Sequence, residues 1–233
     1  MRIRHSAALL GAAMLLSACG GTGSSNAALD TDDQKASYGI GLDMGRSLEP
    51  AKGRLDMPAF TKGIQDAMSG AEPALADSVV QAALQAFSQS VMEAQQAEHT
   101  AAAEKNKTEG ETYMAENGGK DGVITTESGL QYEVLREGDG PRPTADDQVS
   151  VNYKGTLIDG TQFDSSYDRG EPVVFQVGGV IAGFSEALLL MPVGSQFRVV
   201  IPGDLAYGPQ GAGGEIGPNA TLIFEIELLD IVE

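Results

Sequence analysis

The segment 75–117 constrains the fold of this chain more than any other part of the sequence. Between Ala74 and Gly118 the one Gly or Pro residue is Gly110. Gly and Pro are the residues that most often end or interrupt helices, so the segment predicts one continuous connecting α-helix. At about 1.5 Å per residue, such a helix would extend on the order of 60 Å, which is longer than a small globular domain is wide.

The two halves of this predicted helix differ in composition. Val80, Leu84, Phe87 and Val91 follow one another at spacings of four, three and four residues, as in the apolar seam of a coiled coil. Beyond them the sequence consists mostly of Ala, Glu, Gln and Lys. Because a helix that is polar on all sides usually bridges domains through solvent, the second half predicts a solvated connection.

The segment 31–74 predicts a small helical domain with two short helices. Apolar residues recur at helical spacing in both, and the stretch from Pro50 to Gly53 separates them. Packing of the seam inside its own domain is one reading, but two short helices offer it little apolar surface. A small helical unit buries such a face more readily against a second copy, so we expect a homodimer formed through 31–74 and the seam.

The first 30 residues have the composition of a targeting segment. Residues 1–18 carry arginines at positions 2 and 4 and continue as an apolar run, which is too short to span a membrane and is typical of a signal peptide. The sequence LSAC, ending at Cys19, resembles a bacterial lipobox, in which the cysteine is lipidated; an ordinary signal peptide with a chance cysteine is the alternative. The lipobox reading predicts a lipidated flexible tether over 19–30 and, in a Gram-negative bacterium, anchoring at the periplasmic or surface face of the outer membrane.

The composition excludes several kinds of site. The chain has 15 Lys and Arg against 33 Asp and Glu, a formal charge of −18, and such a surface repels phosphate backbones, so we expect no nucleic-acid partner. Loss of Arg2 and Arg4 with the signal peptide takes this charge to −20 and leaves His99 as the one histidine. Once Cys19 is lipidated no free thiol remains, so the sequence argues against a cysteine nucleophile, a Cys/His zinc site and any metal.

From Val123 onward the pattern changes from helix to strand. Apolar residues alternate over 130–134 and again over 149–153, and the pair Asp159-Gly160 predicts a hairpin turn. A short apolar helical piece follows at 184–190. The sequence therefore predicts an α+β fold, in which residues 123–233 form an antiparallel sheet packed on one short helix.

Five short motifs in this region resemble those of a known family. In chain order they are Tyr153 to Gly155 (YKG), Gly160 to Ser166 (GTQFDSS), Val180 to Phe184 (VIAGF), Leu205 to Gly208 (LAYG) and Asn219 to Phe224 (NATLIF). Their order and approximate spacing are similar to those of the FKBP family of peptidyl-prolyl cis–trans isomerases. The N-terminal helices, with the sequence SYGIG at 37–41, and the long helix resemble its dimerising Mip/FkpA-type branch, so the resemblance covers nearly the whole mature chain.

The resemblance implies an enzyme that accelerates rotation about X-Pro peptide bonds and needs no cofactor. A peptide bond resists rotation by about 18–20 kcal/mol, whereas the cis and trans forms of X-Pro differ by only about 0.5–1 kcal/mol. No bond breaks, so no nucleophile is required. Because the twisted transition state is less dipolar than the planar amide, an apolar pocket that excludes water lowers the barrier.

The resemblance also implies which residues form the pocket. The catalytic residues would be Tyr153, Phe163, Asp164, Ile181, Tyr207 and Phe224, and the substrate-binding residues Val173, Val180, Phe184 and Ile216. In this picture the Tyr207 hydroxyl and the Ile181 N–H hold substrate carbonyls, and the Asp164 carboxylate lies at the edge of the pocket. Phe224 and Ile216 are almost as readily explained as core residues.

Several positions differ from the family pattern or stand outside it. Phe184 occupies the position of a tryptophan that is common in the family, Val173 that of a phenylalanine, and Ala182 that of an arginine found in some members. These differences bear on pocket depth, substrate preference and macrolide affinity. The three charged residues that follow the second motif are expected on the solvated surface: Asp168, Arg169 and Glu171.

The expected partners are unfolded or partly folded proteins of the cell envelope that contain proline, with macrolide inhibitors as candidate ligands of the same pocket. The alternative function is a dimeric holding chaperone, in which two long helices splay a cleft that grips a client and isomerisation is incidental. A host-facing surface role is a third reading, which no residue of the chain requires.

Overall fold

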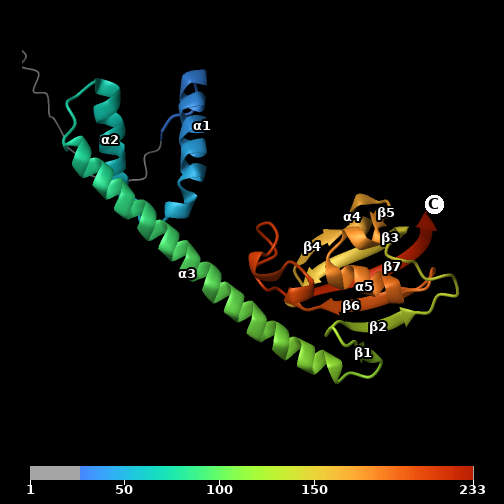
Figure 1. Cartoon of the computed structure of the whole chain (residues 1–233). Helices are drawn as coiled ribbons and strands as arrows, with labels where there is room; N and C mark the ends of the chain where they lie inside the picture. Colours follow the sequence, from blue (N-terminus) through green and yellow to red (C-terminus); the bar gives the residue numbers. More distant parts are fainter. Residues whose placement is uncertain (1–26, 233) are drawn as a thin grey trace, which may run out of the picture. The chain divides into compact units, whose positions relative to one another are not determined.

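The computed structural model describes residues 27–232 of the chain (Figure 1). The predicted signal peptide, the predicted lipidation at Cys19 and most of the predicted tether lie outside these residues. The described residues divide into two compact units, the first ending at Lys62 and the second beginning at Gly63. The limits 31–74 and 123–233 that the sequence suggests for its domains stay predictions. Among the described residues, no helix combines the length and the apolar character that crossing a membrane requires.

The first unit is helical where it is described. Its elements are α1 (Asp32–Ser47), the 3₁₀ turn η1 (Glu49–Ala51) and the beginning of α2 (Met57–Ser69). A capping box starts α1, because Thr31 Oγ1 accepts the Gln34 N–H and Gln34 Oε1 accepts the Thr31 N–H. Neither α1 nor α2 contains a buried residue, and Ala51 is the one buried residue between 27 and 62.

The second unit contains α3 (Asp77–Gly118), a single helix of 42 residues. The near absence of Gly and Pro therefore predicted this long helix correctly. Gly110 does not interrupt it. This residue is buried, and a Cβ at its position would lie 2.2 Å from Thr221 Oγ1, so the absence of a side chain permits a close approach between α3 and the C-terminal domain.

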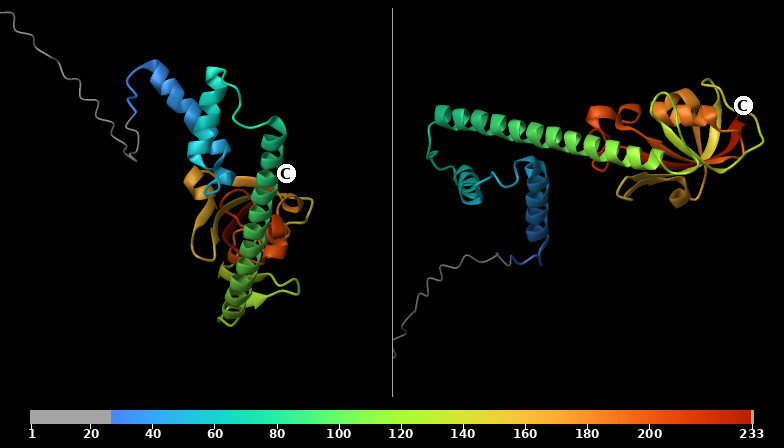
Figure 2. Two further views of the ribbon diagram at one scale, coloured as in Figure 1. Left: turned by 90° about the vertical axis from the view of Figure 1, so that its left-hand side faces the viewer. Right: turned by 90° about the horizontal axis from the view of Figure 1, so that it is seen from below.

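Seven strands of the described chain form one sheet in the order β1-β2-β6-β7-β3-β4, with β5 paired to β3. The strands are labelled in Figure 1, and Figure 2 gives two further views of the same ribbon. Every pairing is antiparallel, as the sequence predicted. The strands are β1 (Val123–Thr125), β2 (Gln131–Arg136), β3 (Gln148–Leu157), β4 (Gln162–Ser165), β5 (Val173–Gln176), β6 (Gln196–Ile201) and β7 (Leu222–Val232). The predicted hairpin joins β3 to β4 through Gly160, whose φ of 90° suits glycine.

Short helical elements connect the strands. They are α4 (Ser166–Arg169), η2 (Val177–Gly179), α5 (Ala182–Leu190), η3 (Gly203–Leu205) and η4 (Gly208–Gln210). The sequence predicted α5 but not α4. The α4 turn begins where Ser165 Oγ accepts the Asp168 N–H and ends at Gly170, which adopts a left-handed conformation with φ of 78°.

The core lies between α5 and the face of the sheet that α5 covers (Figure 1). Alternate residues of the two long central strands point into it, as strand geometry requires. These buried residues are Val149, Val151 and Tyr153 of β3, and Leu222, Phe224, Ile226 and Leu228 of β7. From α5 the side chains of Phe184, Ala187 and Leu188 pack against them. Three aromatic members of this core, Tyr153, Phe184 and Phe224, also face a cavity.

Candidate active site

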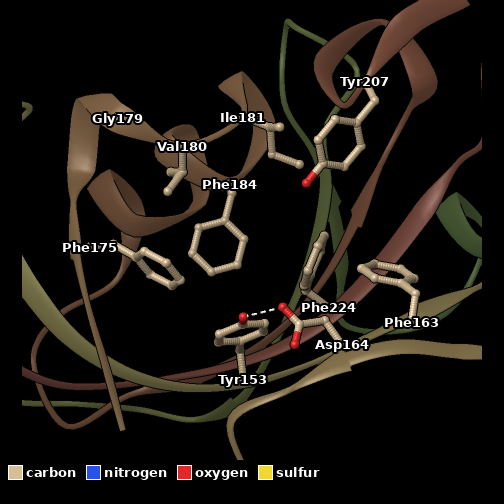
Figure 3. A pocket seen from close by; sticks show the side chains of 10 residues that line it. All are labelled: Tyr153, Phe163, Asp164, Phe175, Gly179, Val180, Ile181, Phe184, Tyr207 and Phe224. Atoms are coloured by element: carbon tan, nitrogen blue, oxygen red, sulfur yellow. Dashed lines mark hydrogen bonds between the residues drawn. The ribbon is translucent and has the colours of Figure 1, made fainter. Parts of the chain in front are cut away.

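A cavity of about 480 Å³ opens beside the first turn of α5 (Figure 3). Eight of the ten pocket residues expected from the sequence line it: Tyr153, Phe163, Asp164, Val180, Ile181, Phe184, Tyr207 and Phe224. Phe175 and Gly179 line it as well and were not expected. The structure thus brings together side chains from β3, β4, β5, α5, β7 and the loop after β6.

Val173 and Ile216 are the two expected residues that do not line this cavity. Val173 is half-buried against the hydrophobic core, and Ile216 is a buried member of the core itself. In place of Val173, the cavity wall uses Phe175, two residues along β5. Residues two apart in a strand share one face, so the bulkier side chain on that face is the signal that could have identified Phe175 from sequence.

Five aromatic rings form the floor and wall of the cavity, largely in edge-to-face contact. The Phe184 and Phe224 centroids lie 5.1 Å apart with ring planes at 86°, and those of Phe163 and Phe224 lie 5.6 Å apart at 82°. Tyr153 meets the edge of Phe184 at 6.0 Å, and Phe175 does so at the same distance. Such pairs contribute about 0.5–1.5 kcal/mol each beyond the burial of their area, so the wall is rigid.

Gly155 makes this ring arrangement sterically feasible. It lies opposite Phe224 in the β3–β7 register. A Cβ at this position would approach Phe163 Cζ to 2.6 Å and Phe224 Cε1 to 2.9 Å. Any larger residue would therefore push both rings out of the wall. The glycine of the first sequence motif is explained by packing against the cavity wall rather than by turn geometry.

A hydrogen-bonded cluster around Asp164 forms the polar edge of the cavity. The Tyr153 hydroxyl donates to Asp164 Oδ2, as the dashed line in Figure 3 marks. Arg169 Nη1 donates to Asp164 Oδ1 at 2.5 Å, and the Ser165 N–H donates to the same oxygen at 2.8 Å. Arg169 Nη2 reaches the Tyr153 hydroxyl oxygen at 2.9 Å. The carboxylate is thus held in one orientation by three donors.

The expectation that Arg169 is a solvated surface residue was incomplete. Its side chain is 44% exposed, yet the guanidinium bonds to Asp164 and also lies 5.5 Å from the centroid of the Tyr153 ring. The α4 turn is the physical reason, because it folds Arg169 back toward β4. Asp168 and Glu171 are exposed as expected, and the Asp168 carboxylate accepts a hydrogen bond from Gln162.

The cluster shifts the pKa values of its members in opposite directions. Burial by itself raises the pKa of Asp164, but the hydrogen bonds from Tyr153 and Arg169 outweigh it and hold the pKa below its ordinary value. Burial, followed by the hydrogen bond to Asp164, raises the pKa of Tyr153 above its ordinary value. The cluster therefore keeps a carboxylate beside a protonated phenol across the whole neutral range.

Two hydrogen-bond donors lie on the opposite side of the cavity from Asp164, in Tyr207 and Ile181. The Tyr207 side chain is 41% exposed and its hydroxyl points toward the cavity (Figure 3). Ile181 precedes α5 as its N-cap residue. Within residues 27–232, neither the Tyr207 hydroxyl nor the Ile181 N–H has a hydrogen-bond partner. Both are available to a ligand carbonyl that enters the cavity.

The polar groups of the cavity are one carboxylate, two phenols and backbone amides. None of the ten lining residues is His, Cys, Ser or Lys. In the described part of the chain, no group of three or more His, Cys, Asp and Glu residues is placed to hold a metal ion. The arrangement suits binding and orientation of a planar amide more than covalent chemistry.

Two family models match this chain in order. The model of the domain amino-terminal to FKBP-type peptidyl-prolyl isomerases matches residues 33–134, and the model of the FKBP-type peptidyl-prolyl cis–trans isomerase itself matches residues 140–229. The second match includes every residue that lines the cavity.

Individual relatives are similar over most of their length. The FKBP-type 22 kDa peptidyl-prolyl cis–trans isomerase of Escherichia coli (strain K12) is 47% identical over 204 residues, which cover 87% of this chain and 97% of the relative. The outer membrane protein MIP of Legionella longbeachae is 44% identical over 203 residues, 87% of each protein. Among solved structures, the crystal structure of FkpA from Escherichia coli superposes with a TM-score of 0.68 at 40% identity, over 88% of this chain and 98% of that one.

These matches extend over the helical N-terminal region as well as the domain with the cavity. They confirm both the resemblance seen in the five motifs and the predicted fold class. The chain therefore belongs to the FKBP family of peptidyl-prolyl cis–trans isomerases, in its Mip- and FkpA-like branch, and is an isomerase of X-Pro peptide bonds.

Proposed function

We propose that the aromatic cavity performs the isomerisation by taking an X-Pro amide out of water. The single observation that supports this mechanism is the cavity itself, about 480 Å³ in volume and walled by five aromatic rings. A proline ring seated there loses the water that favours the planar, dipolar amide, while the twisted transition state loses less. The enzyme thus binds the transition state better than the ground state.

The polar groups at the rim orient the substrate in this mechanism. The Tyr207 hydroxyl and the Ile181 N–H donate to substrate carbonyls, and their lack of partners within the described chain supports that role. The Asp164 carboxylate, fixed by Tyr153 and Arg169, presents negative charge at the edge of the site. Phe163, Val180, Phe184 and Phe224 enclose the proline ring, and Val173 and Ile216 support this wall from the core.

This mechanism predicts a rate that depends on neither proton transfer nor pH near neutrality. We expect kcat/KM for cis-to-trans exchange of a short X-Pro peptide to be equal in H₂O and D₂O and constant between about pH 5 and 9. The reason is that the pKa of Asp164 is lowered and that of Tyr153 raised, so neither group changes protonation in this window. A bell-shaped profile or a deuterium effect above twofold, well beyond experimental error, would contradict the mechanism.

The substrates we propose are proline-containing segments of unfolded or partly folded proteins in the cell envelope. A relative that is 44% identical carries the name outer membrane protein MIP, and the first 19 residues of this chain have the pattern of a lipoprotein signal. We therefore place the enzyme at the outer membrane through a lipid on Cys19. The stretch 19–30 would give the folded part its reach from the membrane.

Exposed apolar side chains on α1 and α3 support a homodimer. In the first unit, Tyr38, Ile40, Leu42 and Met44 of α1 are all at least 40% exposed. In the second unit, Leu84 of the predicted seam is 61% exposed. Helices as short as α1 and α2 are not stable in water without a covered apolar face. A second copy of the chain offers a matching apolar face that could cover it.

Sedimentation of the full chain tests the dimer. We expect a dimer at micromolar concentration and a shift to monomer in Leu84→Glu, because a buried unpaired carboxylate is costly at an apolar interface. Ala82→Glu is the matched control: it adds the same charge at the heptad position opposite the seam, and it should leave the dimer intact. A monomeric wild type would refute the proposal.

A further inference from the structure

The loop that carries Tyr207 contacts α3 through residues that do not line the cavity. Asn106 Nδ2 donates to the Pro218 carbonyl oxygen at 2.8 Å. At the neighbouring Gly217, a Cβ would approach the same nitrogen to 2.9 Å. One turn further along α3, the buried Gly110 lies against Thr221, which is itself 5% exposed. The helix thus closes over the end of this loop at two successive turns.

The turn at 217–219, which Asn106 of α3 contacts, is also hydrogen-bonded to Gly208, the residue after Tyr207. The Asn219 N–H donates to the Gly208 carbonyl oxygen at 2.8 Å. Asn219 has a φ of 54° and is the one non-glycine residue among those described with a positive φ. On its other side, a Cβ at Gly203 would lie 2.6 Å from Asn219 O. The turn therefore has little freedom, and it links Asn106 to Tyr207 through two hydrogen bonds and two short lengths of backbone.

The end of α3 is itself fixed to the sheet, so it can serve as a rigid support. Gln131 Nε2 donates to the Met114 carbonyl oxygen at 2.8 Å, and Asn117, 2% exposed, donates to Gln131 Oε1 at 2.9 Å. Arg198 Nη2 donates to the Tyr113 hydroxyl oxygen at 2.7 Å. These bonds reach β2 and β6. A helix held at this end transmits its position to the turn at Pro218.

We propose that Asn106 is a positioning residue for prolyl isomerisation, acting through the turn at 217–219 to set the place of Tyr207. The last turns of α3 are then part of the catalytic unit, although the two family models divide the chain between 134 and 140 and assign α3 to the N-terminal part. The inference rests on the role proposed above for the Tyr207 hydroxyl.

Asn106→Ala and Asn106→Asp in the full chain test this. Both remove the amide donor, and the second preserves the shape of the side chain. We expect kcat/KM for an X-Pro peptide to fall about fivefold in each, the size of effect that follows from one part-buried hydrogen bond. Thr108→Ala is the control on the same helix; Thr108 is exposed and its hydroxyl bonds only to Glu104 of α3, so activity should be unchanged.

A double-mutant cycle with Tyr207→Phe separates positioning from a general structural effect. If Asn106 acts through the Tyr207 hydroxyl, Asn106→Ala causes no further loss of kcat/KM in the Tyr207→Phe background. Full additivity of the two changes overturns the proposal, as does wild-type activity in both Asn106 variants.

Amide hydrogen exchange gives a readout that does not depend on the role of Tyr207. Asn106→Ala should speed exchange of the Asn219 N–H while amides of the β3–β7 pairing keep their protection. If Tyr207→Phe alone leaves kcat/KM intact, the proposed role of Tyr207 fails. Unchanged Asn219 exchange in Asn106→Ala means instead that Asn106 does not hold the turn, and the inference fails separately.

Substitutions that change side-chain size at the contact between Gly110 and Thr221 provide an independent check. Gly110→Ala places a methyl group 2.2 Å from Thr221 Oγ1 and should lower kcat/KM as the Asn106 variants do. Adding Thr221→Ala removes the clashing oxygen and should restore most of the loss. Failure of this rescue, with Thr221→Ala alone active, contradicts a steric coupling between α3 and the loop.

Discussion

Asp164→Asn will lower kcat/KM for an X-Pro peptide by about tenfold or more, since hydrogen bonds to a charged group contribute about 1.5–3 kcal/mol. The carboxylate accepts from Tyr153 and Arg169 at once, and an amide can offer only one acceptor to those two donors. Both the charge at the cavity edge and the orientation of the Tyr153 ring are lost together. Peptide isomerisation assays on the purified full chain measure the effect.

Asp168→Asn is the matched control for this change. Asp168 lies four residues along the chain, is exposed, and bonds through its carboxylate to Gln162 rather than to any lining residue. The same charge is removed from the same surface, but kcat/KM should stay at the wild-type value. Equal losses in the two variants would attribute the effect to net charge and remove Asp164 from the mechanism.

The Asp164 variant also has a defined pH signature in stability. The folded-state pKa of Asp164 lies below its unfolded value, so its contribution to the unfolding free energy is fully present above about pH 4. That contribution is lost as the pH falls through the lower, folded-state pKa. The difference in unfolding free energy between wild type and Asp164→Asn should therefore be constant from about pH 5 to 8 and shrink in more acidic solution.

Phe184→Ala will lower the unfolding free energy by about 3–5 kcal/mol and remove the floor of the cavity. Phe184 is 4% exposed and its ring meets those of Tyr153, Phe175 and Phe224. Loss of one such apolar contact surface for the proline ring should reduce kcat/KM by about tenfold or more. Chemical denaturation measures the first quantity, and the peptide assay at low temperature, where the variant stays folded, measures the second.

Phe197→Ala distinguishes loss of the floor from loss of stability. Phe197 is 3% exposed and stacks on Tyr132 with centroids 5.4 Å apart, but it does not line the cavity. Its removal should destabilise the domain by a similar amount and leave kcat/KM per folded molecule near wild type. A matching loss of activity in Phe197→Ala would show that the assay reports folding and not the cavity.

The sequence predicts the elements of this protein well because their signals are local. The run with a single glycine and no proline predicts α3, the alternation over 149–153 predicts the inner face of β3, and Asp159-Gly160 predicts the hairpin. The five motifs identify the family because their order along the chain is the signal, and this order can be recognised without knowing where each side chain lies in the structure.

The parts of the site that the sequence did not predict depend on where short turns direct the chain. Arg169 reaches Asp164 because of the α4 turn, which rests on one serine cap and one left-handed glycine. Ile216 pairs with Ala212 in an isolated bridge and is buried in the core. The contact between Asn106 and Pro218 joins residues 112 positions apart, and no periodic pattern encodes such a contact.

Phe184 and Phe224 belong to the hydrophobic core and to the cavity wall at the same time. A wall made of core side chains cannot yield to a bulky substrate without loosening the packing that keeps the domain folded. In the mechanism proposed above, adaptation to different amino acids before proline must therefore come from exposed side chains around the rim. Selectivity in this enzyme can evolve by exchanging rim residues while the aromatic wall is retained.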